Sequence, residues 1–141
     1  MAVDHRQSLE QLCQQYNVSI LYVFGSRTLE ARQWLDGILV DLHSPSDVDV
    51  GVRAASGATG SVKDKVRLAL ALETLMGCGR VDLVVLQEAD PFLAVEIIRG
   101  ERLYARDEYE ADEYDLYILR RAGDLIPLER ERQALILGET L

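Results

Sequence analysis

The sequence predicts an α+β protein of one domain, with an α/β core over residues 1–106 and a helical extension over residues 107–141. Three observations lead to this prediction. Residues 18–24 and 80–86 are rich in β-branched and apolar side chains, and residues 46–52 alternate between polar and apolar, so each run is typical of a strand. Apolar residues recur at helical spacing between these runs and again after residue 107. A chain of 141 residues is long enough to bury a substantial core.

Composition and charge exclude several classes of function. The net charge is -9 and the pI is about 4.7, which argues against sequence-independent binding of nucleic acid, because such binding needs a basic surface. Cys13 and Cys78 lie far apart without metal-ligand spacing and are expected to be free thiols. No apolar signal region or membrane-length apolar run occurs, so we expect a cytoplasmic protein that does not contact a membrane.

The first third of the chain reads as helix, strand and helix. Residues 3–16 place apolar side chains on one stripe, and residues 18–24 are apolar on both faces, as in a buried central strand. Gly25 and Ser26 follow, with Ser26 as the expected N-cap of a short helix over residues 27–35. A strand, a glycine and a helix start can form an anion site from backbone N–H groups, but Gly-Ser is common and by itself favours an ordinary turn. Asp36-Gly37 predicts a turn, and residues 38–42 an additional short strand.

Two carboxylates stand two residues apart in the next strand. Strand side chains alternate, so Asp47 and Asp49 point to one face while the intervening valines point to the other. Like charges held this close repel each other unless a cation binds between them, and Mg²⁺ prefers a few carboxylates together with substrate phosphates. The alternative is an amphipathic strand with a solvated face. His43, just before this strand, is expected to be a loop residue.

The remaining core alternates again between helices and strands. Ser61 is the expected N-cap of a helix over residues 62–76 that ends at a glycine. Its predicted buried stripe is Val62, Val66, Ala69, Leu72, Leu75 and Met76. In the strand that follows, Asp82 interrupts an apolar run, and it either pairs with Arg80 or joins the Asp47 and Asp49 pair. Asp90-Pro91 starts another helix, and residues 102–105 form an edge strand.

Residues 107–141 are helical and acidic. They contain ten acidic and four basic residues, which account for -6 of the net charge. Gly123 and Pro127 predict two helices or a kinked one. The acidity predicts either a solvated face or a surface that attracts a basic protein partner.

The order of strand, Gly-Ser, Ser-Asp-x-Asp on a second strand and an aspartate in a third resembles the nucleotidyltransferase superfamily that includes DNA polymerase beta. More closely, the chain is similar to the minimal nucleotidyltransferases (MNT), the partners of HEPN proteins in toxin–antitoxin pairs. The stretch Ile97-Ile98-Arg99-Gly100-Glu101-Arg102-Leu103-Tyr104-Ala105-Arg106-Asp107 is part of this similarity. The resemblance implies a mixed sheet with helices packed on one side and a helical C-terminal segment.

The resemblance also implies a role for each motif residue. Gly25 and Ser26 match the pair that holds the nucleotide triphosphate, and Asp47 and Asp49 match the pair that binds magnesium. Asp82 matches the third carboxylate, which helps to hold a second metal ion and activates the attacking hydroxyl. All three aspartates are therefore candidate catalytic residues and candidate metal ligands. Two metal ions bridged by carboxylates neutralise charge on the attacking and leaving oxygens of such a transfer.

Two departures from the family pattern keep alternatives open. Glu30 or Ala31 stands where the family has a second glycine, and the segment from Ser26 to Asp47 is longer than usual, with the insertion at residues 34–43. The first hypothesis is a magnesium-dependent antitoxin that transfers AMP from ATP to a tyrosine of a HEPN toxin, in a homo- or hetero-oligomer. The second is a non-catalytic antitoxin that binds its toxin through the acidic C-terminal region. The third is an aminoglycoside-type small-molecule nucleotidyltransferase.

Overall fold

The computed structural model describes residues 4–42, 47–55 and 62–138. Its strands are β1 (Val18–Phe24), β2 (Val48–Ala54), β3 (Val81–Val85) and β4 (Glu101–Ala105). Its helices are α1 (His5–Gln15), α2 (Thr28–Leu35), α3 (Val62–Met76), α4 (Pro91–Ile98) and α5 (Glu108–Ile136). Short 3-10 turns follow β1 and β3. Every helix and strand of the structure lies close to a predicted range, but the strand expected over residues 38–42 does not form.

The strands form a mixed sheet in the order β3-β2-β1-β4, as the resemblance implied. β1 is antiparallel to both β2 and β4, whereas β2 and β3 run parallel. β4 lies at an edge, as predicted. The antiparallel pairing brings the end of β1 to the start of β2, and the parallel pairing brings the starts of β2 and β3 together. The Gly-Ser turn and all three aspartates therefore belong to one end of the sheet.

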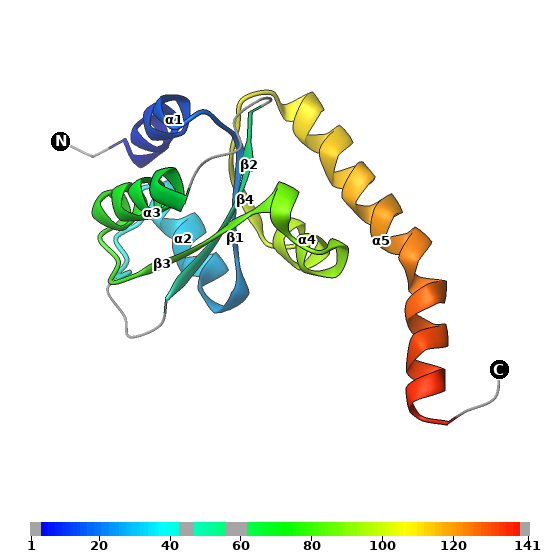
Figure 1. Ribbon diagram of the computed structural model, residues 1–141. Helices are drawn as coiled ribbons and strands as arrows, with labels where there is room; N and C mark the ends of the chain where they lie inside the picture. The colour runs from blue at the N-terminus through cyan, green and yellow to red at the C-terminus, as the bar shows by residue number, and fades with distance from the viewer. Residues whose placement is uncertain (1–3, 43–46, 56–61, 139–141) are drawn as a thin grey trace.

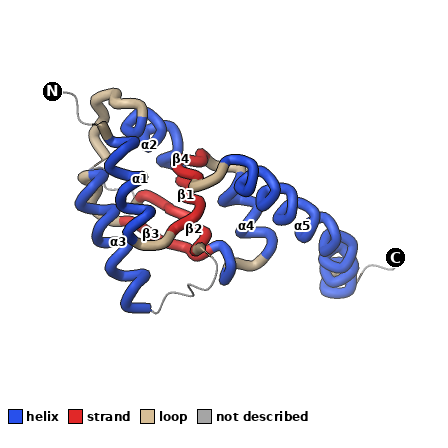
Figure 2. The backbone as a smooth tube through the Cα atoms, turned by 90° about the horizontal axis from the view of Figure 1, so that it is seen from above, coloured by secondary structure: helices blue, strands red, loops and turns tan. Residues whose placement is uncertain are grey.

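Helices cover both faces of this sheet, so the expectation of helices on one side is wrong. α1, α2 and α3 pack on one face, and α4 and α5 lie on the other (Figures 1 and 2). The cause is visible in β1, where Leu21 and Val23 belong to the first core and Ile20 and Tyr22 to the second. A strand that is apolar on both faces needs cover on both to remove its side chains from water.

A glycine in β2 sets how closely α4 approaches the sheet. A Cβ atom at Gly51 would lie 2.3 Å from Cγ2 of Ile97, which is fully buried. The helix therefore packs directly against the backbone of β2. Gly51 shares its sheet face with Asp49, two residues earlier, so α4 covers the sheet next to the candidate site.

Two local predictions are wrong. Residues 38–42 form no strand; Leu42 is buried and Val40 packs on the first core without pairing in the sheet. In α3, Val62 and Val66 are exposed, while Leu68 is buried together with Leu72 and Met76. Apolar residues surround much of α3, so their spacing did not identify the buried face.

The predicted free thiols are confirmed, since Cys13 and Cys78 are both unpaired and buried. His43, Ser46 and Ser61 lie outside the described residues.

α5 is one helix with Pro127 inside it, so the two-helix alternative is wrong. Its axis changes direction in the orange part of the ribbon, as expected of a proline kink, and the last turns stand away from the sheet (Figure 1). Asp107 caps its start by accepting a hydrogen bond from the Glu110 amide. Within the described part of the chain, no helix combines the length and the apolar character needed to cross a membrane. The division into a core and an extension stays a prediction.

Candidate active site

The three predicted aspartates meet at the end of the sheet where β2 and β3 begin. Asp49 and Asp82 are direct partners in the parallel β2–β3 pairing. The preceding partners are Val48 and Val81, and the Val48 amide donates a hydrogen bond to the Arg80 carbonyl at 3.0 Å. Continuing this register back by one residue places Asp47 beside Arg80. Side chains on one face recur every second residue, so these four polar side chains share a face of the sheet.

The Gly-Ser turn closes against the central aspartate. Phe24, the last residue of β1, pairs with Asp49. Gly25 follows with a φ of +78°, and a Cβ atom at this position would lie 2.5 Å from Oδ2 of Asp49. Glycine is therefore required here twice, by the backbone conformation and by the carboxylate beside it. The sequence predicted that Gly25 belongs to the site, and the structure places this glycine against Asp49.

Ser26 is not the N-cap of α2, contrary to the prediction. Gly25, Ser26 and Arg27 form a 3-10 turn, and α2 begins at Thr28 without a side-chain cap. The extra turn explains the difference, because the chain tightens for three residues before it becomes α-helical. Ser26 is exposed, as is Gly25 beside it.

A buried arginine, which sequence reasoning missed, supports this turn. Arg27 is 3% exposed, and its guanidinium donates hydrogen bonds of 3.0 and 2.8 Å to the Glu30 carboxylate. It also donates to the Asp41 carbonyl at 3.3 Å. The Gly-Ser turn is thereby linked to the long segment that precedes β2. Glu30, one of the residues where the family pattern has glycine, is a partner in this link. A charged residue beside Gly-Ser gave no signal that its side chain would be buried.

The electrostatics of the site are those of carboxylates that repel one another. The pKa of Asp49 is raised, first by burial and then by the charges of Asp82 and Asp47. Arg80 partly offsets this repulsion: its guanidinium lies 3.8 Å from Oδ2 of Asp47 and 3.7 Å from Oδ1 of Asp82. Both readings of Asp82 thus hold in the structure, because it pairs with Arg80 and also joins Asp49.

This donor set fits Mg²⁺ in its chemistry. The ligands are carboxylate oxygens that repel each other, and Mg²⁺ binds through one or two carboxylates plus water and substrate phosphates. Among the described residues, no three acidic, histidine or cysteine side chains are already arranged around one ion. That arrangement is not required of an ion that shares its shell with a nucleotide. The side chains of Asp47 and Asp82 are 40% and 54% exposed, so both are free to turn.

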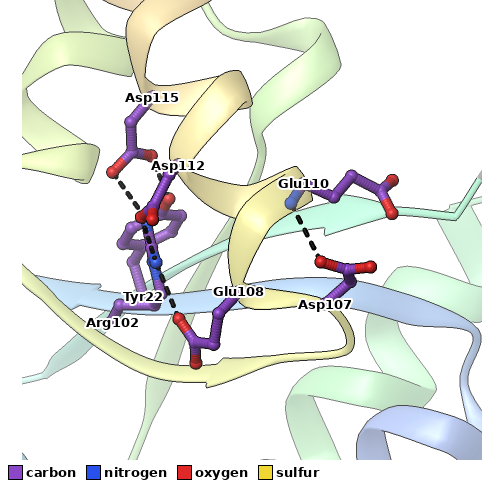
Figure 3. A network of polar contacts seen from close by, with 7 residues as sticks. All are labelled: Tyr22, Arg102, Asp107, Glu108, Glu110, Asp112 and Asp115. Atoms are coloured by element: carbon purple, nitrogen blue, oxygen red, sulfur yellow. Dashed lines mark hydrogen bonds and ion pairs between the residues drawn. The ribbon is translucent and has the colours of Figure 1, made fainter.

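A second acidic cluster lies on the α4 and α5 side of the sheet. Arg102 of β4 contacts three carboxylates at the start of α5, and Asp115 of this group also accepts a hydrogen bond from the Tyr22 hydroxyl (Figure 3). The other two carboxylates belong to Glu108 and Asp112. These acidic residues were predicted to form a solvated or partner-binding face. Here they fasten α5 to the sheet.

A cavity of about 460 Å³ is remote from the aspartates. It lies beside Val18 at the start of β1 and Ala54 at the end of β2, which is the opposite end of the sheet. A nucleotide near Asp49 would instead rest on the exposed surface around Gly25 and Ser26. We therefore place the candidate site by its chemistry and not by the size of a cavity.

Comparison with known proteins finds a family model that covers most of the chain. The family model described as "Polymerase beta, Nucleotidyltransferase" matches residues 7–109, which include all five candidate site residues. No protein with a curated function matches the chain.

Solved structures share the fold over nearly the whole chain. A chain of a toxin–antitoxin structure with AMP-PNP is 22% identical, with a TM-score of 0.65 over 94% of this chain and 96% of that one. A chain of the Shewanella oneidensis structure of a tri-AMPylated HEPN toxin with its MNT antitoxin is 20% identical, with a TM-score of 0.64 over 95% and 94%. A chain of the MntA–HepT toxin–antitoxin structure is also 20% identical, with a TM-score of 0.64 over 95% of both chains. These likenesses extend into α5, beyond the end of the family model.

Proposed function

The chain belongs to the polymerase beta nucleotidyltransferase family, and on this premise we propose that it transfers AMP from ATP to a tyrosine of a HEPN-type toxin, with Mg²⁺ as cofactor. It would act as the antitoxin of a toxin–antitoxin pair. The observation that carries the proposal is the register of the sheet: it joins Asp49 to Asp82 and sets Gly25 against Asp49. Because the reaction uses ATP and an intracellular partner, we place the protein in the cytoplasm.

Each site residue has a role in this proposal. Asp47 and Asp49 would hold Mg²⁺, and Asp82 would help to hold a second ion and would accept the proton of the attacking hydroxyl. Gly25 and Ser26 bind the triphosphate through their backbone and the serine hydroxyl. The ions, when bound, supply positive charge to the phosphate oxygens. The acceptor oxygen forms a bond to the α-phosphorus of ATP, the bond to the β-phosphate oxygen breaks, and pyrophosphate leaves.

The choice of a HEPN toxin as acceptor is supported by the similar structures. One holds a toxin that carries AMP groups together with an MNT antitoxin, and another holds AMP-PNP. The similarity covers 94–95% of this chain, including most of α5. We therefore propose that the chain pairs with a toxin of this kind, and not with an aminoglycoside-type small molecule.

The non-catalytic alternative loses support from the contacts of α5. It rested on an acidic C-terminal region available to a basic partner. Six of the ten acidic residues fall within 107–115. Arg102 engages three of these carboxylates, Asp107 caps the helix, and Glu110 pairs with Arg53 at 3.5 Å. Much of the acidity is thus used within the molecule.

The test is to incubate the protein with ATP, Mg²⁺ and a purified HEPN-type toxin and to measure the intact mass of the toxin. We expect the wild type to add AMP and the Asp47→Asn, Asp49→Asn double variant to add none. The matched control, Asp124→Asn with Glu131→Gln, removes two charges from the exposed side of α5 and should retain the activity. A wild type that suppresses the toxin without adding AMP would support the non-catalytic alternative. AMP addition by the double aspartate variant would refute the metal assignment.

A further inference from the structure

Arg80 stands inside the acidic site without a role in the proposed reaction. It lies immediately before β3, and the hydrogen bond from the Val48 amide to its carbonyl fixes its backbone beside β2. Its guanidinium reaches Asp47, which immediately precedes β2, and Asp82 in β3. An arginine in this position carries a permanent positive charge, since its guanidinium stays protonated at any physiological pH. The site therefore contains a cation that belongs to the protein.

The contacts of Arg80 are loose. Its distances of 3.8 and 3.7 Å to the two carboxylates are those of ion pairs and exceed hydrogen-bond length, and its side chain is 69% exposed. Exposed pairs of this kind contribute little to stability. Arg102, by comparison, is 19% exposed and holds its carboxylates at 2.8–2.9 Å. Little free energy therefore holds the Arg80 guanidinium in place.

A guanidinium and a divalent cation cannot both occupy the space between Asp47 and Asp82. Two positive charges about 4 Å apart repel each other, and both need the same carboxylate oxygens. Without the guanidinium, the three carboxylates would repel each other more strongly, because Asp49 pairs directly with Asp82 and shares a face with Asp47. The arginine thus relieves the same repulsion that a metal ion relieves.

We propose that Arg80 is a displaceable counterion of the acidic site: it neutralises Asp47 and Asp82 in the metal-free protein and competes with the divalent cation for them. The proposal rests on the proposed function, because it takes these aspartates as the metal ligands. Arg80 then acts on the metal site by weakening metal binding in the absence of a nucleotide. The ion would bind firmly only together with the triphosphate, whose oxygens supply further ligands.

The test measures Mn²⁺ binding to the full chain without nucleotide, by electron paramagnetic resonance of the free ion at low ionic strength. Arg80→Gln should bind Mn²⁺ about fivefold or more tightly than the wild type, because a positive charge near the ion is removed. Arg80→Lys retains the charge and should stay close to the wild type. Arg67→Gln is the matched control: Arg67 is exposed on α3, and the loss of its charge should change the dissociation constant by less than about twofold.

A second measurement needs no catalysis either. Ligand that binds the native state raises the thermal midpoint, so Mg²⁺ should raise the midpoint of Arg80→Gln more than that of the wild type or of Arg67→Gln. Suppose that Arg80→Gln binds Mn²⁺ no more tightly than Arg67→Gln, while Asp49→Asn abolishes Mn²⁺ binding. The counterion role of Arg80 is then refuted, and the assignment of the aspartates as metal ligands stands. If no variant binds Mn²⁺, or if Asp49→Asn leaves binding unchanged, the metal assignment fails and the counterion with it.

Discussion

Two clusters in this molecule have the same composition, one arginine with three carboxylates, and opposite physical character. In the α5 cluster, Arg102 makes three contacts of 2.8–2.9 Å and is 19% exposed (Figure 3). In the sheet-end cluster, Arg80 makes contacts of 3.7–3.8 Å and is 69% exposed. The first arginine is held by hydrogen bonds to all three carboxylates. The second only moderates the repulsion in its cluster, where burial and then the charges of Asp82 and Asp47 raise the pKa of Asp49.

The difference separates a structural charge cluster from a candidate functional one. Around Arg102, burial disfavours the charge, but hydrogen bonds to Asp112 and Glu108 outweigh it and raise the arginine pKa. Burial and the bond to Asp115 raise the pKa of the Tyr22 hydroxyl, which keeps it protonated as a donor. Charges that the protein leaves unsatisfied are available to a ligand, which is why perturbed carboxylates collect at active sites.

The largest expected effect on stability comes from replacing the two arginines in turn. Arg102→Met should lower the free energy of unfolding by about 2–3 kcal/mol, because it removes three charge-assisted hydrogen bonds, one of them to the partly buried Asp115. Arg80→Met should change it by less than about 0.5 kcal/mol, as for other exposed pairs. Urea denaturation of both variants without metal measures the difference. Equal losses would show that the two clusters do not differ as their distances and exposure indicate.

Glycine replacements test the next largest difference, the close approach of the backbone to Asp49. Gly25 and Gly37 have similar positive φ values, +78° and +83°, but a Cβ atom at Gly37 meets nothing within 4 Å. Alanine at either position should cost about 1–2 kcal/mol of backbone strain. Only Gly25→Ala should also displace the Asp49 carboxylate and weaken Mn²⁺ binding by roughly tenfold. Metal titration and urea denaturation separate the two effects. Normal Mn²⁺ binding by Gly25→Ala would remove Gly25 from the site.

The fold was predictable wherever one local signal was strong. β1 and α3 have the predicted bounds, because β-branched runs and helical spacing extend over their full length. Residues 38–42 have the same apolar character as a strand, yet Leu42 is buried without any strand pairing. β1 is apolar on both sides, which requires helices on both faces of the sheet, whereas the prediction placed helices on one face only. Tertiary packing determines whether residues 38–42 pair in the sheet and which faces of the sheet are covered. The spacing of apolar residues along the chain carries no information on either.

The sequence supplied the candidate site residues, but it did not supply their geometry. Alternation placed Asp47 and Asp49 on one face, but only the parallel pairing of β2 with β3 brings Asp82 to Asp49. The α5 cluster was missed entirely. Its contacts join Tyr22 to positions 80 and 93 residues further along the chain, and no local pattern connects residues so far apart.

The smallest expected effect is the pH dependence of the metal-free protein. The pKa of Asp49 in the folded state lies above its ordinary value of 3.8, so the folded state binds this proton more firmly than the unfolded state does. Stability must then fall as the pH rises through the range from 3.8 to the raised pKa. Asp49→Asn has no such proton, so its stability relative to the wild type should increase over the same range and level off by neutral pH. We expect a gain of roughly 1 kcal/mol or less.

The matched variant in the other cluster should behave oppositely. Asp115→Asn loses charge-assisted hydrogen bonds to Arg102 and Tyr22, so at neutral pH it should be less stable than the wild type by about 1–2 kcal/mol. Urea denaturation at pH 4, 5.5 and 7 in the presence of a chelator measures both variants. Mg²⁺ in place of the chelator should stabilise the wild type and not Asp49→Asn, and so reduce or reverse the advantage of that variant. If Asp49→Asn were less stable than the wild type at pH 7 without metal, its carboxylate would be a structural group like that of Asp115. The sheet-end cluster would then hold its charges for stability and not for a ligand.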